Sequence, residues 1–357
     1  MNATLDRRRR LLLLSTAAGL ATTRLSLAAE PAVLPPPLRR IAMPAGDGLP
    51  SFNGALGWIN SPPLDAAALR GKPVLVNFCT YTCINWLRTL PWVKAWAAKY
   101  QEQGLLTVGV HTPEFSFERD PVNVRPALSR LGIDYAVAID SEHAIWRAFN
   151  NQYWPALYLA DAQGRIRYRQ FGEGDYAQTE RMIQKVLGKG ESALVRPEAQ
   201  GISLPADWKQ LRSPENYLGS ARTENFASPG GKGSRRGYEL PASLQLNQWA
   251  LAGDWTMGEE ASVSNRPRAR LACRFHARDL HLVMSPSSSD KPLRFQIKLN
   301  GQPPGMHHGL DIDEQGMGSL HAPGLYQLIR QKQAIADQAF EIEFLEPGAQ
   351  IYAFTFG

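Results

Sequence analysis

The hydrophobic pattern changes its period part-way along the chain, and this change limits the fold to two unlike domains. Between residues 73 and 187, continuous apolar runs alternate with stretches whose apolar residues recur at helical spacing. Beyond residue 240 the apolar residues occupy every second position instead, as in RARLACRFHA and LRFQIKL. The first pattern is typical of an α/β domain and the second of an all-β sandwich. A length of 357 residues is also that expected for about two domains.

The first region predicts a mixed sheet with helices between its strands. The apolar runs PVLVNF, LLTVGV and YAVAI suit buried strands, and ALYLA, the turn DAQG and RIRYRQF predict an antiparallel hairpin. We expect helices over about 84–100, 121–131, 141–149 and 176–187.

The second region predicts a β-sandwich or jelly roll, because short alternating segments are separated by Asn-Gly and Pro-Gly turns. Between the two regions lies a polar, Gly-rich stretch that we interpret as a connection. The predicted organisation is a signal peptide, a Pro-rich tether, an α/β domain, a linker and a β-sandwich, at 1–28, 29–50, 51–190, 191–221 and 222–357.

The first 28 residues have the layout of an export signal. Arg7–Arg10 form a basic segment, and Leu11–Ala21 form an apolar stretch too short to span a bilayer. The small residues Ser26 and Ala28 then suit a cleavage site. Paired arginines followed by leucines resemble a twin-arginine signal, with the general secretory route as the alternative. We therefore expect the mature protein to be periplasmic or otherwise exported.

Composition excludes several classes of protein. A hydrophobic content of 44% excludes global disorder, and three cysteines are too few for a disulfide scaffold. The net charge is +6, but the first 28 residues supply +4 of it, so charge gives no support to a nucleic-acid partner. No later segment has the roughly 18 uninterrupted apolar residues of a membrane helix. We expect no integral membrane segment after signal removal, and a compartment in which disulfides are allowed.

The segment CTYTCINWLRTLP, residues 79–91, carries the chemistry. Cys83 is predicted at the junction of a buried strand and a helix, where helix N–H groups stabilise an anion and favour the nucleophilic thiolate. We therefore expect a Cys83 pKa below the ordinary value of about 8.5. Far along the chain, Trp154-Pro155 opens the predicted hairpin, and it resembles the place at which thioredoxin folds have a cis-proline (here Pro155) that faces the cysteine.

These residues together resemble the thioredoxin superfamily and its redoxin members, such as the TlpA-like and peroxiredoxin-like proteins. The segments CTYTCINWLRTLPWV, GVHTPEFSFE, FNNQYWPALYL and FGEGDY are similar to the periplasmic thioredoxin-like domain of DipZ-type proteins. SPENYL, ENFASPGG and the terminal AFTFG are similar to the carbohydrate-binding-like β-sandwich of that family. The resemblance implies a thioredoxin-like domain followed by this sandwich, a thiol-based redox activity, and no cofactor or metal.

The chain departs from the family pattern at the reactive site. The family's usual site is Cys-Ile-Asn-Cys, whereas here Trp86 replaces the second cysteine. A two-cysteine site releases its mixed disulfide when the second thiol attacks the first, so Cys83 cannot complete that cycle alone. Cys79, four residues upstream, is a candidate resolving thiol if its Cα lies within about 7 Å of that of Cys83. The alternative for Cys79 is a buried core residue.

Other candidate site residues lie near the same point. Thr80, three residues before Cys83, resembles the Thr-x-x-Cys of peroxiredoxins, in which the hydroxyl binds peroxide. His111 and Glu114 follow a strand whose carboxyl end is predicted to lie near the cysteine. His111 is a candidate for tuning the thiolate or relaying protons, with a solvated loop histidine as the alternative. Trp86 is expected to cover the sulfur of Cys83.

The second region offers weaker candidates. Trp249 and Trp255 are either sugar-stacking platforms or core residues, and Cys273 alternates with apolar neighbours as a core residue does. The His307-His308 pair with Asp311 and Asp313 is interpreted as a polar hairpin loop. A calcium loop would need Glu at its twelfth position, where Ala322 stands.

Three functions remain open from the sequence. The first is a thiol oxidoreductase in which Cys83 attacks a protein thiol or disulfide and either Cys79 or an external thiol reductant resolves it. The second is a one-cysteine peroxidase that reduces peroxide through a sulfenic acid. The third is a non-catalytic thioredoxin-like module joined to a glycan- or protein-binding sandwich.

Overall fold

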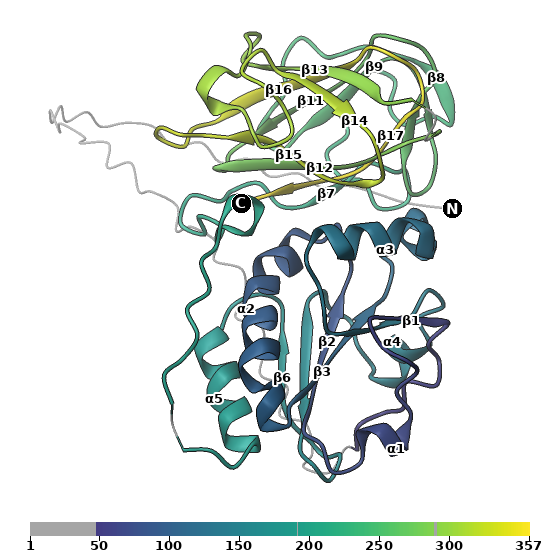
Figure 1. The fold of residues 1–357 in the computed structure, drawn as a ribbon. Coiled ribbons are helices and arrows are strands. Elements are labelled where there is room, and N and C mark those ends of the chain that lie inside the picture. Colours follow the sequence, from purple (N-terminus) through teal and green to yellow (C-terminus); the bar gives the residue numbers. More distant parts are fainter. Residues whose placement is uncertain (1–47, 191, 289–290) are drawn as a thin grey trace, which may run out of the picture. The chain divides into compact units, whose positions relative to one another are not determined.

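Strand β2 (Val74–Cys79) lies inside the N-terminal sheet. All of its residues are buried, and most are apolar, so both of its faces are covered. In the computed structural model, which describes residues 48–190, 192–288 and 291–357, this sheet has the order β1-β4-β3-β2-β5-β6 (Figure 1). Strands β2, β3 (Leu106–His111) and β4 (Ala136–Ile139) run parallel. β1 (Gly57–Ile59) pairs antiparallel with β4, and β5 (Ala156–Ala160) and β6 (Ile166–Phe171) form the expected antiparallel hairpin.

Helices cover both faces of this sheet. Leu75 and Cys79 of β2 belong to the core shared with helices α2 (Ile84–Tyr100), α3 (Pro121–Arg130) and α5 (Tyr176–Val186). Val74, Val76 and Phe78 point to the opposite face and pack with Ile145 of α4 (Ala144–Ala148). A further short helix, α1 (Ala66–Leu69), begins at the side-chain cap of Asp65. This layered mixed sheet is the thioredoxin-like fold that the sequence predicts.

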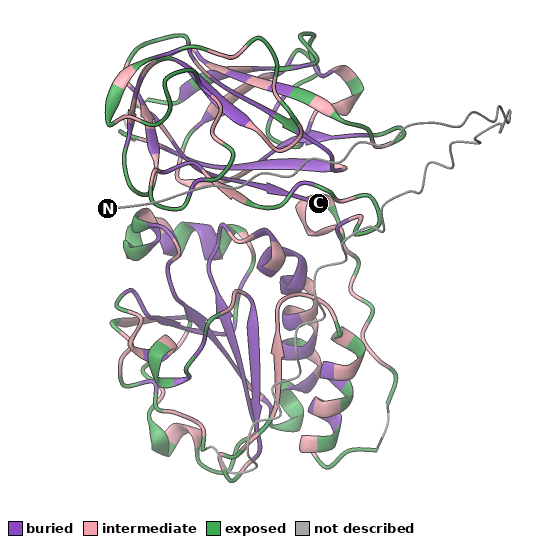
Figure 2. Ribbon diagram, turned by 180° about the vertical axis from the view of Figure 1, so that it is seen from behind, coloured by how far each residue is buried: buried purple, intermediate pink, exposed green. Residues whose placement is uncertain are grey.

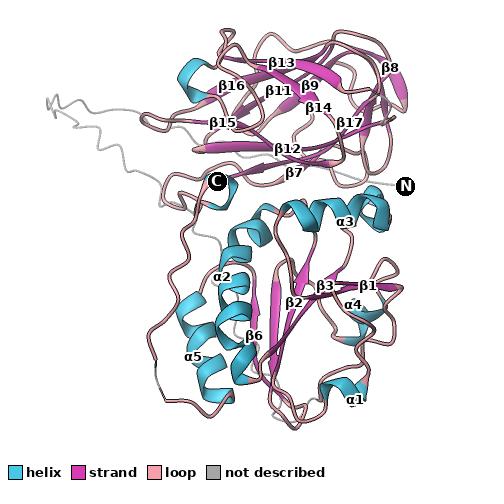
Figure 3. Cartoon of the chain, in the orientation of Figure 1, coloured by secondary structure: helices cyan, strands magenta, loops and turns pink. Residues whose placement is uncertain are grey.

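The rest of the described chain is all-β, and α-helices occur only before residue 190 of the described part (Figure 3). Eleven strands are hydrogen-bonded in the order β14-β13-β16-β11-β9-β10-β17-β12-β15, with β7 added on β17 and β8 on β9. Their inner faces enclose one large apolar core, as expected for a β-sandwich. The strands are β7 (Asn216–Tyr217), β8 (Arg235–Tyr238), β9 (Trp249–Met257), β10 (Ser262–Ser264), β11 (Ala269–Phe275), β12 (Asp279–Pro286), β13 (Leu293–Leu299), β14 (Met317–Leu320), β15 (Gly324–Arg330), β16 (Gln338–Phe344) and β17 (Ala349–Phe356).

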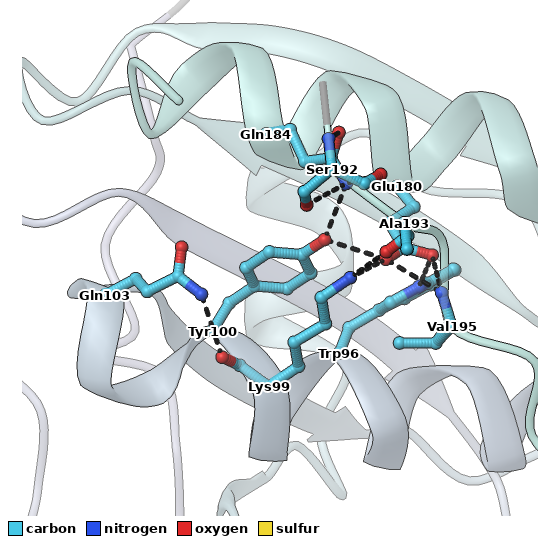
Figure 4. Close-up of polar contacts among 9 residues, drawn as sticks. All are labelled: Trp96, Lys99, Tyr100, Gln103, Glu180, Gln184, Ser192, Ala193 and Val195. Atoms are coloured by element: carbon cyan, nitrogen blue, oxygen red, sulfur yellow. Dashed lines mark hydrogen bonds and ion pairs between the residues drawn. The ribbon is translucent and has the colours of Figure 1, made fainter. Parts of the chain in front are cut away.

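The segment 191–221, expected as a linker, is part of the folded structure at both of its ends. At its start, the N–H of Val195 donates to the buried carboxylate of Glu180, which also accepts hydrogen bonds from Tyr100 (2.7 Å) and Lys99 (2.8 Å) (Figure 4). At its end, β7 pairs with β17, and Leu218 is completely buried in the sandwich core. The strands of the sandwich are largely buried (Figure 2). The linker prediction missed these contacts because two-residue strands and single anchoring residues leave no periodic signal in a sequence.

The predicted signal peptide and most of the predicted tether lie outside the described residues. Within the described part, no helix has the length and apolar character needed to cross a membrane.

Candidate functional site

Cys83 is the N-cap residue of α2, where the turn that follows β2 enters the helix. Its N–H donates to the carbonyl of Thr80 at 3.2 Å, which closes this turn. The thiol is partly buried and donates to the carbonyl oxygen of Trp154, with an Sγ···O distance of 3.8 Å. The peptide bond between Trp154 and Pro155 is cis, as the sequence predicts, and the indole Nε1 of Trp154 donates to Thr112 at 3.1 Å. The structure therefore brings Cys83 and the residue preceding Pro155 together across 71 positions of sequence.

The expectation that the pKa of Cys83 lies below its ordinary value is wrong. Burial and the neighbouring Glu114 carboxylate raise the pKa of this thiol well above its ordinary value. The backbone N–H groups of Trp86 and Asn85 at the start of α2 oppose this rise but do not outweigh it. The helix end does favour the thiolate, but the loss of water and a nearby negative charge have the larger effect.

The other two cysteines are core residues. Cys79 ends β2, is 2% exposed, and donates its thiol to the carbonyl of Val110 in β3 at 3.4 Å. Cys273 lies in the sandwich core, and burial raises the pKa of both thiols. Cys79 and Cys83 are both free thiols, and their sulfur atoms bond to different carbonyl groups.

Trp86 faces the core, and its covering of the Cys83 sulfur stays a prediction. Its side chain is fully buried in the core under α2, and its indole Nε1 lies 3.1 Å from the side-chain oxygen of Asn77 in the amide orientation that satisfies both groups. The position three residues into the helix therefore faces the sheet, so the residue that replaces the second cysteine has a packing role.

His111 and Thr80 are buried rather than solvated. His111 is the last residue of β3 and is fully buried, and its ring stacks on that of Tyr81 with centroids 5.7 Å apart. Burial lowers the pKa of His111 to about 3, so the ring is neutral and cannot stabilise a thiolate as a cation. The alternative of a solvated loop histidine is also wrong. Thr80 is completely buried in the turn before Cys83.

Two glutamates of GVHTPEFSFE organise the loop after β3. Glu118 is fully buried, and its carboxylate accepts hydrogen bonds from the N–H groups of Glu114 (2.8 Å) and Phe115 (3.0 Å) and from the hydroxyl of Thr82 (2.7 Å). This ties the loop to the turn that carries Cys83. Sequence reasoning missed Glu118, because Phe115 stands where a capping box would have Ser or Thr and so leaves no signal in the sequence.

Glu114 is the charged neighbour of Cys83, as the position of its strand predicts. The hydroxyl of Tyr217 donates to its carboxylate at 2.5 Å, and Nη2 of Arg222 lies 3.7 Å away. Burial and Glu215 raise the pKa of Glu114 to about 7, against the opposing effects of Tyr217 and Arg222. Tyr217 lies in β7 of the sandwich sheet and Arg222 follows it in the chain, and sequence reasoning gave neither of them a role at the site.

A pocket of about 470 Å³ opens beside Trp154. Its walls combine residues from two parts of the chain: the loop after β3 together with His143 and Trp154, and the residues Arg222 and Glu260. The carboxylate of Glu260 accepts hydrogen bonds from the N–H and hydroxyl of Ser116 at 2.8 and 2.5 Å, which closes one side of the pocket. The thiol of Cys83 bonds to the carbonyl of a residue that lines this pocket.

The candidates in the β-sandwich have structural roles. Trp249 and Trp255 are fully buried in its core, so neither is a sugar-stacking platform on the surface. Asp311 and Asp313 accept backbone hydrogen bonds from Gln327 and Met317, as residues of a loop do. No group of three or more His, Cys, Asp or Glu side chains among residues 48–190, 192–288 and 291–357 is arranged to hold a metal ion.

Comparison with known proteins finds relatives of both parts of the chain. A family model described as "Thioredoxin like C-terminal domain" matches residues 213–357. Protein DipZ of Mycobacterium tuberculosis is 33% identical over 318 residues, which are 86% of this chain and 42% of DipZ. The chain thus spans less than half the length of this relative.

A shorter relative decides the family. The thiol-disulfide oxidoreductase YkuV of Bacillus subtilis is 30% identical over 143 residues, which are 40% of this chain and 96% of YkuV. The chain belongs to the thioredoxin superfamily. A crystal structure of a thiol:disulfide interchange protein of the thioredoxin family from Chlorobium tepidum covers 41% of the chain and 100% of its own, with 24% identity and a TM-score of 0.35.

Proposed function

We propose that this protein carries out thiol–disulfide exchange through Cys83 as a single reacting thiol. One observation carries the proposal: Cys83 begins α2, is partly accessible, and faces the carbonyl that precedes the cis-proline Pro155 at 3.8 Å. The other two cysteines are buried in the cores of their domains. Thiol–disulfide oxidoreductases among the relatives support the same chemistry.

The reaction starts with the thiolate of Cys83. It attacks one sulfur of a protein or low-mass disulfide, a mixed disulfide forms, and the other substrate sulfur leaves as a thiolate that takes up a proton. An external thiol then attacks the mixed disulfide, releases Cys83, and itself becomes disulfide-bonded to the first half of the substrate. Trp86 supplies no second thiol, so this step needs a reductant from outside the chain.

Cys79 is the less favoured resolving group. It is 2% exposed and its sulfur bonds to the carbonyl of Val110, whereas Cys83 bonds to that of Trp154. A Cys79–Cys83 disulfide therefore requires both thiols to leave their present partners. We propose an external thiol for this reason and keep the internal disulfide as an outcome of the test.

Reduction of peroxide is the second candidate, because a single accessible thiol without a CxxC partner also suits it. The thiolate attacks the O–O bond, giving a sulfenic acid and water, or an alcohol from an alkyl peroxide. Two equivalents of an external thiol then return Cys83 to the thiol, with release of water and formation of a disulfide.

Peptide-mapping mass spectrometry under non-reducing conditions tests these proposals. The reduced protein is treated with glutathione disulfide or with peroxide, with Cys83→Ser as control. We expect a mixed disulfide at Cys83 with glutathione disulfide. A sulfenate at Cys83 with peroxide alone would favour the peroxidase, and a Cys79–Cys83 bond would favour internal resolution. If all three thiols stay unmodified, the chain is a non-catalytic binding module and the proposal fails.

We also propose that the protein is exported, on the basis of the arginine cluster and apolar stretch near its N-terminus. Replacing Arg8 and Arg9 by Lys preserves charge, so the general secretory route tolerates the change whereas the twin-arginine route does not. Cell fractionation of the double variant is expected to show retention inside the cell. Normal export would exclude the twin-arginine route.

A further inference from the structure

Two arginine side chains line the pocket beside Trp154 with their guanidinium groups half exposed. Nη2 of Arg222 lies 3.7 Å from Glu114, and Nη1 of Arg119 lies 4.0 Å from Glu142. Both distances exceed hydrogen-bonding range. Each of these two side chains is 56% exposed. Each guanidinium is ion-paired with its glutamate but has five N–H donors, so it retains donors beyond the one nearest the glutamate.

The acidic groups of the same pocket are already engaged. Glu260 accepts two hydrogen bonds from Ser116, and Glu114 accepts one from Tyr217. Part of the accepting capacity of these two carboxylates is thus used within the protein, whereas the nearest carboxylate lies 3.7 Å from Arg222 and 4.0 Å from Arg119. The chemistry of the walls therefore favours a carboxylate over an amine.

A stacking contact orients the guanidinium group of Arg222 without occupying its N–H donors. Its guanidinium carbon lies 3.4 Å from the centroid of the Tyr217 ring, a stacking contact that orients the planar group and leaves its edges free. Tyr217 in turn is fixed by its hydrogen bond to Glu114. The fork of donors is therefore pre-oriented, which lowers the entropy lost when an anion binds.

Trp154 connects the pocket with the reacting sulfur. It lines the pocket, and its carbonyl accepts the hydrogen bond from Cys83. Cys83 itself does not line the pocket, so a disulfide bonded to its sulfur would reach the pocket walls past Trp154.

We propose that Arg222, assisted by Arg119, selects disulfide substrates that carry a carboxylate close to the S–S bond. This inference rests on the proposed function of Cys83 and specifies its substrate class. It also gives the segment that leads into the β-sandwich a role at the thiol site, because Arg222 and Tyr217 come from that segment.

Three small disulfides that differ mainly in their end groups test the proposal: dithiodipropionate (anionic), bis(hydroxyethyl) disulfide (neutral) and cystamine (cationic). The rate of mixed-disulfide formation at Cys83 is measured for each by mass spectrometry on the full chain. The readout is the ratio of the dithiodipropionate rate to the bis(hydroxyethyl) disulfide rate, so general effects on the thiol cancel.

We expect this ratio to fall about two- to fivefold in Arg222→Gln, as for a partly exposed ion pair. We expect it to be only partly kept in Arg222→Lys, because lysine retains the charge but not the planar fork stacked on Tyr217. Arg119→Gln is a second variant and is expected to lower the ratio less. The wild-type ratio is expected to fall with added salt. Arg266→Gln is the matched control, because Arg266 is 76% exposed, pairs with Asp254 at 3.6 Å and does not line the pocket.

The possible results distinguish failure of the proposed substrate class from failure of the proposed function of Cys83. If the neutral disulfide reacts at Cys83 but the ratio is the same in wild type, Arg222→Gln and Arg119→Gln, the substrate class is wrong and the function stands. If cystamine is preferred and Arg222→Gln does not alter the preference, the inference is also overturned. If none of the three disulfides reacts at Cys83, the proposed function itself fails.

Discussion

At the scale of single residues, the reactivity of Cys83 depends on a balance between its surroundings. The N–H groups at the start of α2 favour the thiolate, and burial together with Glu114 disfavours it. Glu114 has a pKa of about 7, so its carboxyl group gains or loses its charge near neutral pH. A negative charge on Glu114 therefore adds to the effect of burial on the pKa of Cys83.

Removing this charge is predicted to activate Cys83. In Glu114→Gln the thiolate no longer faces a carboxylate, so its pKa falls and alkylation by iodoacetamide at pH 8 becomes about threefold to tenfold faster. Glu102→Gln, which removes an exposed carboxylate of the same domain, is the control and is expected to leave the rate unchanged. An equal rate in all three proteins would mean that Glu114 does not act on Cys83.

The pH profile carries a second signature of the same coupling. A simple thiol below its pKa alkylates about tenfold faster for each pH unit, because the thiolate fraction rises in that proportion. As pH rises through about 7, Glu114 loses its proton and the new negative charge raises the pKa of Cys83. We therefore expect the wild-type rate to rise less than tenfold per unit between about pH 6 and 8, and Glu114→Gln to restore the full slope. A full slope in the wild type would contradict this coupling.

At the scale of elements, side-chain contacts hold α2 at several points behind its reactive N-cap residue, Cys83. In its middle, Arg88 is 3% exposed and donates to Glu173 at 3.1 Å and to the carbonyl of Phe356 at 3.2 Å. At its end, the buried Glu180 of α5 receives hydrogen bonds from Tyr100, Lys99 and Trp96 (Figure 4). A helix held at these points keeps Cys83 in place at the mouth of the turn.

The Glu180 anchor is predicted to stabilise the fold in a pH-dependent way. Burial alone would raise its pKa, but hydrogen bonds from Lys99, Tyr100 and Val195 hold the pKa of Glu180 below its ordinary value of 4.5. A depressed carboxyl pKa contributes stability above the unfolded value, and this contribution is lost as pH falls through the folded value. In Glu180→Gln we expect a free energy of unfolding lower by about 1–3 kcal/mol at pH 7, with a smaller difference at pH 3.

Chemical denaturation at the two pH values measures this effect. Glu102→Gln again serves as the control, because Glu102 is exposed. A difference between Glu180→Gln and wild type that is equal at pH 7 and pH 3 would contradict the role of the charge.

Periodic elements could be predicted from sequence, and contacts between distant residues could not. The helix over 84–100 and the strand over 156–160 have the observed bounds, because long apolar periodicity determines them locally. The burial of His111, the inward turn of Trp86 and the pKa of Cys83 depend on which side chains surround each residue in three dimensions. The position of Cys83 at a helix start was predictable, but the carboxylate beside it and its desolvation were not.

At the scale of the whole molecule, the structure supports a sandwich domain that begins earlier than the sequence predicts. Leu218 is fully buried in the sandwich core, and its N–H donates to the carbonyl of Tyr352 at 2.7 Å. The family model likewise begins its match at residue 213. We therefore propose 213–357 as the domain.

Two fragments test this boundary. We expect residues 213–357 to unfold in one cooperative transition by thermal circular dichroism. Residues 222–357 lack β7 and Leu218 and are expected to be less stable by at least about 2 kcal/mol, the cost of losing a buried leucine. Equal stability of the two fragments would return the boundary to residue 222, and an unfolded 213–357 fragment would show that the sandwich depends on the first domain.

The central claim is that Cys83 is the reacting thiol, and competitive alkylation of the folded protein tests it most directly. The native chain is exposed to limiting iodoacetamide, quenched at intervals, and the modification of Cys83, Cys79 and Cys273 is followed in the same molecules by peptide mass spectrometry. We predict that Cys83 is modified first, at a rate that increases with pH towards 9, while Cys79 and Cys273 react only when the protein unfolds. If Cys83 is instead protected to the same degree as Cys273, the account is contradicted.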